Sequence, residues 1–130
     1  MNSDVSNFGL NELGQVSITI SDLDKAVGFY RDMLKLKHLF SAPPDLAFFA
    51  CGKVRLMLSR PEPGQGESLT AGLYFKVPEI KEARDALAAR GVVFESEPHL
   101  VARMPDHELW MGFFRDPDRN LLAIMSEKRT

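Results

Sequence analysis

The stretch GQVSITISDLDKAVGFYRDML, residues 14–34, decides the fold class of this chain. Polar and apolar residues alternate strictly over residues 15–20, which is the pattern of a strand with one apolar face. Ser21 and Asp24 then form an S-x-x-D pattern that predicts the start of a helix. Apolar residues at helical spacing continue to Leu34, so the stretch predicts a strand followed by an amphipathic helix.

The same pattern returns in the second half of the chain. Residues 73–77 alternate again, and a second helix is predicted to begin at Pro78 and to end at Gly91. After each helix we expect a short strand and then a hairpin, the two hairpins spanning residues 46–59 and 108–125. The order βαβββ therefore occurs twice, an internal repeat of the α+β class.

The repeat predicts the domain organisation. Residues 1–12 are polar and are expected to be a flexible N-terminus. We expect residues 13–130 to form a single domain of two βαβββ modules, at about 13–60 and 71–127. The Pro- and Gly-rich segment 61–70 is the predicted linker between them.

Composition excludes several classes of protein. With 130 residues the chain is long enough for one domain. Its net charge of −2, from 16 basic and 18 acidic residues, provides no basic field for nucleic acid. The apolar run at 46–51 is far shorter than the roughly 20 residues of a membrane span. The lone Cys51 predicts no internal disulfide and favours a cytoplasmic location.

Two stretches resemble a known family. Residues 14–34, with Asp22-Leu23-Asp24 ahead of Phe29-Tyr30, and FFRDPDRNLLAIM, residues 113–125, resemble the opening and closing segments of the glyoxalase / bleomycin resistance protein / extradiol dioxygenase superfamily, also called the vicinal oxygen chelate superfamily. The resemblance implies a half-open barrel of two βαβββ modules around a ligand cavity. Arg119 and Lys35 stand where the family commonly has glycine, which predicts locally different turns.

The resemblance also implies where a metal would bind. In metal-dependent members, four side chains from the first and last strands of the two modules hold a divalent ion. These positions match Gln15, Leu56, Gly72 and Ala123. Leucine, glycine and alanine offer no side-chain lone pair, whereas a catalytic metal needs three or four ligands. We therefore expect no metal cofactor at this place, and metal-dependent glyoxalase or dioxygenase chemistry is disfavoured.

The ligand cavity is predicted on the inner faces of the strands. Polar residues of the first strand would point inward, as would Tyr74, and the small Gly72 and Ala123 would leave space for an apolar group. The alternative is a solvated groove with no specific role. The predicted cavity residues are Gln15, Ser17, Thr19, Leu56, Gly72, Tyr74 and Ala123.

About ten extra residues in the second module fall in segment 96–107. His99, His107 and the nearby Trp110 could belong to a loop over the cavity mouth, with histidine as acid, base or metal ligand. The alternative is a surface loop with two scattered histidines and a tryptophan in the core. The spacing of the two histidines matches no recognised metal motif.

Two functional classes remain open. The first is a metal-free protein, similar to the bleomycin resistance branch, that binds a small amphipathic or aromatic molecule in the barrel cavity. The second is a glyoxalase- or dioxygenase-type enzyme, a lyase or oxidoreductase, with no metal or with a non-standard site built from Gln15 and His99 or His107. Because a half-barrel exposes sheet edges and an open cavity, a homodimer is expected.

Overall fold

A computed structural model describes residues 12–61 and 72–129. The N-terminal module consists of β1 Gln15–Thr19, α1 Leu23–Gly28, η2 Phe29–Met33, β2 Lys37–Ala42, β3 Leu46–Cys51 and β4 Val54–Ser59. The C-terminal module consists of β5 Leu73–Lys76, α2 Ile80–Ala89, β6 Phe94–Arg103, β7 His107–Arg115 and β8 Leu121–Arg129. The predicted α+β class with two βαβββ modules is confirmed, and η2 is a π-helical continuation of α1. Within the described residues, no helix is both long and apolar enough to cross a lipid bilayer.

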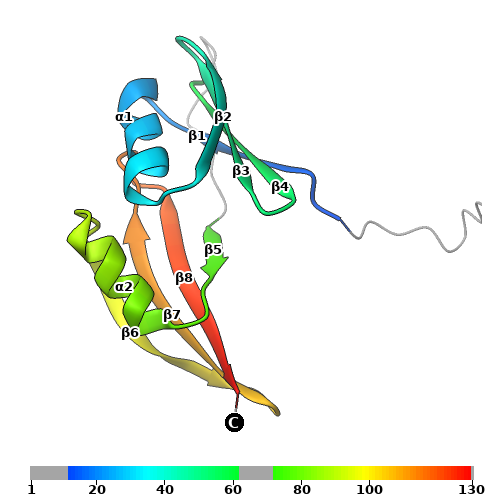
Figure 1. Ribbon diagram of the computed structural model, residues 1–130, viewed down its shortest axis with the longest axis vertical. Helices are drawn as coiled ribbons and strands as arrows, with labels where there is room; N and C mark the ends of the chain where they lie inside the picture. The colour runs from blue at the N-terminus through cyan, green and yellow to red at the C-terminus, as the bar shows by residue number, and fades with distance from the viewer. Residues whose placement is uncertain (1–11, 62–71, 130) are drawn as a thin grey trace, which may run out of the picture.

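Each module contains one four-stranded sheet, and the two sheets have the same topology. The N-terminal sheet has the order β1-β4-β3-β2 and the C-terminal sheet the order β5-β8-β7-β6. In each sheet the first and last strands of the module pair in parallel, and the other neighbours are antiparallel. Figure 1 shows both helices on one side of the sheets, which are not closed into a barrel. The face of each sheet that points away from its helix is called its open face below.

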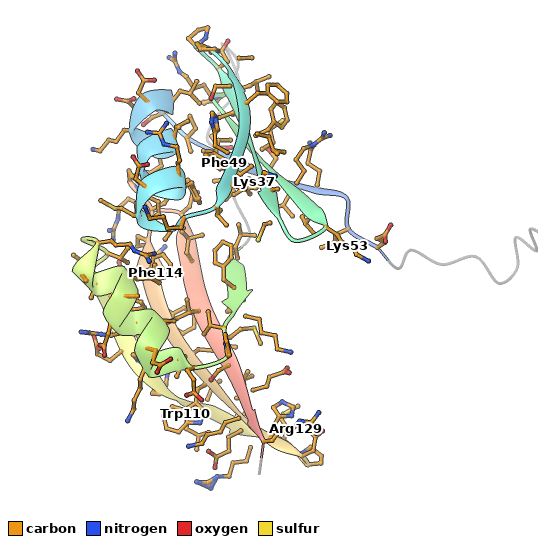
Figure 2. All side chains as sticks on the ribbon, viewed as in Figure 1. Lys37, Phe49, Lys53, Trp110, Phe114 and Arg129 are labelled. Atoms are coloured by element: carbon orange, nitrogen blue, oxygen red, sulfur yellow. The ribbon has the colours of Figure 1, made fainter. Side chains whose placement is uncertain are left out.

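The core lies between each sheet and its helix. On β1 the alternation buries Ile18, which is fully enclosed, while its neighbour Ser17 lies on the open face. Phe49 on β3 and Phe114 on β7 occupy equivalent places, since each pairs with a buried leucine of the last strand of its module. Figure 2 shows both phenylalanines on the helix side of their sheets. The period-two pattern of the strands therefore produces this core.

The helix and turn boundaries differ in detail from the sequence predictions. The first helix is capped by Asp22, whose carboxylate accepts the N–H of Lys25 at 3.1 Å, and not by Ser21. Lys35 and Arg119 have φ angles of 61° and 69°, the left-handed conformation that glycine favours. The prediction of different turns at these two positions is therefore wrong. Both turns adopt the left-handed conformation, although it costs a residue with a Cβ about 1–2 kcal/mol.

The extra residues of the C-terminal module form strands and not a loop. β6 continues to Arg103 and β7 begins at His107, so most of segment 96–107 lengthens this hairpin. Pro98 is accommodated because it lies on the edge strand β6, within the register shift between Ser96 and His99. The predicted linker 61–70, apart from its first residue, lies outside the described residues, as do residues 1–11.

A hydrogen-bonded turn between β7 and β8 joins the two modules. The carboxylate of Asp116, which is 3% exposed, accepts the Tyr30 hydroxyl from η2 at 2.8 Å. Asp118 accepts the N–H of Ser21 at 2.8 Å, and the Asn120 side chain donates to the carbonyl of Thr19 at 3.0 Å. Three residues of one turn therefore hold the start and the end of the first helix of the other module.

Candidate functional site

The open face of the N-terminal sheet carries three of the predicted cavity residues. Gln15, Ser17 and Thr19 all point to this face, as the alternation along β1 predicts. Leu56 does not share their face. It pairs with Val16 and Phe49, is 2% exposed and belongs to the core under α1. The prediction that Leu56 lines the cavity with Gln15 is wrong, because a shift of one residue along a strand moves a side chain to the opposite face.

Arg55 takes the place beside Gln15. The two residues are register partners on neighbouring strands, and the Arg55 Nε donates to the Gln15 Oε1 at 2.7 Å. The Gln15 amide nitrogen in turn lies 3.8 Å from the sulfur of Met57. The guanidinium carbon of Arg55 lies 5.4 Å from the centroid of the Phe48 ring, a cation–π contact. Both polar ends of the Gln15 side chain therefore have partners within the sheet.

A pair of aromatic rings extends this surface. Phe48 stacks on Phe40 of the neighbouring strand with ring centroids 4.7 Å apart, and Phe40 is 52% exposed. Arg55 is exposed and makes no ion pair with any residue in the described parts of the chain. A guanidinium without an ion pair, beside the exposed ring of Phe40 and the half-buried ring of Phe48, can hold an aromatic molecule that carries a negative charge.

Sequence reasoning missed Arg55 and the two phenylalanines as site residues. The signal was nevertheless present in β4, where two of the three residues that alternate with Val54, Leu56 and Leu58 are polar, namely Arg55 and Ser59. This period-two pattern places Arg55 on the same face as Gln15 once the strands pair in parallel.

The open face of the C-terminal sheet carries the other predicted residues. Ala123 lies on β8 between Tyr74 on β5 and Phe113 on β7, which are its register partners. The two rings meet edge to face with centroids 6.1 Å apart, so they lean across Ala123, which is 1% exposed. A Cβ at Gly72 would lie 3.5 Å from the Tyr74 ring, an ordinary contact. Aromatic rings therefore occupy the space that the small residues were expected to leave, and Tyr74 remains 48% exposed.

The two histidines and the tryptophan do not form one site. His99 lies on the open face, 6.4 Å from the Phe113 ring between centroids, and is paired with Met111. His107 lies on β7 four positions before Met111, the register partner of His99. At the usual rise of a strand this is a distance of about 13 Å. His107 contacts Asp106 at 2.7 Å, whereas Trp110 packs against the core on the helix side.

The donor set does not fit a catalytic metal ion. On β4 the open-face neighbours of the mismatched Leu56 are Arg55, a cation, and Met57, a soft thioether. By register, Met57 pairs with Ser17 just as Ala123 pairs with Tyr74, so Met57 is the true counterpart of Ala123. Across residues 12–61 and 72–129, no three His, Cys, Asp or Glu side chains come together in a way that could hold a metal. Zinc, iron and nickel sites need three or four N, O or S side-chain ligands around one point, and Gln15, Met57 and His99 do not form such a group.

Comparison with known proteins identifies the family. Residues 12–124 match the model of the "Glyoxalase/Bleomycin resistance protein/Dioxygenase superfamily". The uncharacterized protein YraH of Bacillus subtilis (strain 168) is 30% identical over a match that covers 87% of this chain and 96% of that protein.

Solved structures share the fold at low sequence identity. A lactoylglutathione lyase from Agrobacterium tumefaciens superposes with a TM-score of 0.73 at 23% identity, covering 91% of this chain and 95% of the other. The virulence protein STM3117 from Salmonella typhimurium superposes with a TM-score of 0.74 at 18% identity, covering 92% and 98%. At these identities the likeness concerns the fold alone.

Proposed function

Because the chain belongs to the Glyoxalase/Bleomycin resistance protein/Dioxygenase superfamily, we propose that it binds a small aromatic or amphipathic molecule on its open sheet faces without a metal ion. The observation that carries this proposal is the pairing of Gln15 with Arg55 at 2.7 Å. A guanidinium there would repel a divalent cation and attracts an anionic group instead.

The chemistry of the face favours a ligand with an acidic group on an aromatic body. Arg55 presents several N–H donors in a planar arrangement, of which Gln15 uses one, so donors remain for a carboxylate or sulfonate. The stacked rings of Phe40 and Phe48 offer an apolar surface to the body of the same molecule. The ligand would then be held by charge at one end and by stacking at the other.

Binding of 8-anilinonaphthalene-1-sulfonate, an aromatic anion that fluoresces when bound, tests this proposal. We expect Arg55→Gln to weaken binding about tenfold, the loss of one charge-assisted contact. Arg31→Gln is the matched control, since Arg31 lies on η2 and pairs with its neighbour Asp32 at 2.9 Å. Equal affinities for the parent and the Arg55 variant would contradict the proposal.

Elemental analysis of the purified protein tests the absence of a metal. We expect no stoichiometric zinc, nickel, iron or manganese, because the donors on the open faces do not gather around one point as a metal site requires. About one equivalent per chain, lost when Gln15 is replaced together with His99 or His107, would overturn this expectation and support the enzyme alternative. That alternative needs a glutamine in one sheet and a histidine in the other to share an ion, whereas the Gln15 amide already bonds Arg55 and Met57.

The exposed surface supports a homodimer. Large apolar side chains lie exposed on both sheets, among them Phe40, Tyr74 and Val101, and a second copy would remove them from water. We expect sedimentation velocity at micromolar concentration to show a dimer. Phe40→Glu, which places a charge on the N-terminal open face, should shift the equilibrium toward the monomer if that face is covered. A monomer at all concentrations of the parent protein would contradict the prediction.

A further inference from the structure

A second candidate binding site lies away from the open faces, on the helix side of the molecule. A cavity of about 190 Å³ opens where the end of the first helix meets α2. Its walls come from both modules, with Leu34 and Leu36 on one side and Phe75 and Ala83 on the other. Figure 1 shows that the C-terminal end of α2 approaches the end of η2 at this point.

The interior of this cavity is apolar. Its floor is formed by Phe114 and Ile124, which are 1% and 2% exposed. Apart from one residue, every side chain that lines it is a hydrocarbon or an aromatic ring. An apolar cavity of about 150 Å³ stays dry and binds benzene in a well-studied case, so this one has room for a single ring with a short substituent.

The exception is Arg90, at the exposed rim. Its Nη1 donates to the carbonyl of Met33 at 3.2 Å, which brings the guanidinium across to the end of η2. Arginine has five N–H donors, so this contact leaves others unused. Within the described residues, Arg90, which follows α2, makes no ion pair, in contrast to Arg84 on α2, which binds Glu97 at 2.7 Å. A positive group with free donors therefore borders an apolar cavity.

We propose that this cavity binds a monocyclic aromatic carboxylate, with the ring against Phe114 and the carboxylate on Arg90. The volume limits the apolar part to one ring, and the rim arginine selects an acid over a neutral compound. Because Leu34 and Leu36 belong to one module and α2 to the other, the ligand would bridge the two modules. The site shares no residue with the open faces.

Phenylacetate and neutral benzyl alcohol are the probes, titrated into the full chain while the methyl resonances of leucine and isoleucine are followed by NMR. We expect both to shift the methyl signals of Leu34, Leu36 and Ile124. Arg90→Gln should weaken phenylacetate about tenfold and leave benzyl alcohol unchanged, because only the carboxylate needs the cation. Arg84→Gln, the matched control, should change neither affinity.

Two further variants complete the test. Ala83→Leu fills the cavity and should abolish the shifts that both probes cause at Leu34, Leu36 and Ile124. If it does not fold, Ala86→Phe closes the rim from an exposed position and should have the same effect. Arg55→Gln should leave the phenylacetate shifts at these three cavity residues intact, which separates this site from the open face. Methyl shifts confined to other residues, no binding, or equal phenylacetate affinities for the parent and Arg90→Gln would each overturn the proposal.

Discussion

Replacing Asp116 with alanine is expected to lower the free energy of unfolding by about 3 kcal/mol or more. The Asp116 carboxylate is buried and accepts four hydrogen bonds. One comes from the Tyr30 hydroxyl, and three come from the turn, through the N–H groups of Asp118 and Asn120 and the Asn120 side chain. Alanine would leave these donors without an acceptor, and each buried donor left unpaired costs about 1–3 kcal/mol.

The effect should be larger than that of an ordinary turn mutation because the turn joins the two modules. Tyr30 is fully buried in the N-terminal module and Asp116 belongs to the C-terminal one. Urea unfolding followed by circular dichroism measures the loss. Tyr30→Phe is the control, since it removes only the hydroxyl and should cost about 1 kcal/mol. If Asp116→Ala lowered the free energy of unfolding by less than Tyr30→Phe does, the Asp116 carboxylate would not join the modules.

The same contact predicts a loss of stability at high pH. Burial raises the pKa of the Tyr30 hydroxyl well above its ordinary value of 10, and the neighbouring Asp116 charge adds to this. Above pH 10 the unfolded chain loses the Tyr30 proton while the folded chain retains it. The contribution of the protonated Tyr30 hydroxyl to the free energy of unfolding is complete below pH 10 and decreases as the pH rises further. The Tyr30→Phe variant has no hydroxyl and should not show this decrease.

Phe49→Ala is expected to lower the free energy of unfolding by about 3–5 kcal/mol, the usual range for a buried phenylalanine. Phe49 is fully enclosed beneath the first helix. Its ring lies 6.1 Å from that of Tyr30 and 5.1 Å from that of His38, between centroids. Its removal leaves a cavity among rigid neighbours, which limits how far the core can collapse.

Phe48→Ala provides the matched control for this prediction. Phe48 is the preceding residue of β3, of the same type, but it lies half-buried on the open face beside Phe40. Its loss removes one stacked pair and should cost about 1 kcal/mol. Thermal and urea unfolding of both variants give the comparison. Equal losses, or a larger loss for Phe48, would contradict the assignment of the two faces.

The face of each strand follows from its own residues wherever the alternation is read within that strand. Ile18 and Phe75 lie on the helix side, while Ser17 and Tyr74 lie on the open side, as the pleat of a strand requires. Leu56 came from matching the metal positions of the family onto β4, whereas the register places Met57, one residue further on, beside Ser17 on the open face. A difference of one residue suffices to exchange an open-face side chain for a core leucine.

The sequence by itself determined the two βαβββ modules, because periods of two and of about four residues are local properties that each segment carries alone. It also placed Gly72 and Ala123, whose side chains have no donor atoms in any conformation, at two of the positions where the resemblance implies metal ligands. Only the tertiary structure decided that Tyr30 meets Asp116, 86 positions along the chain, and that Arg90 reaches the end of η2. These contacts depend on how the two modules sit against each other, and no local period encodes that placement.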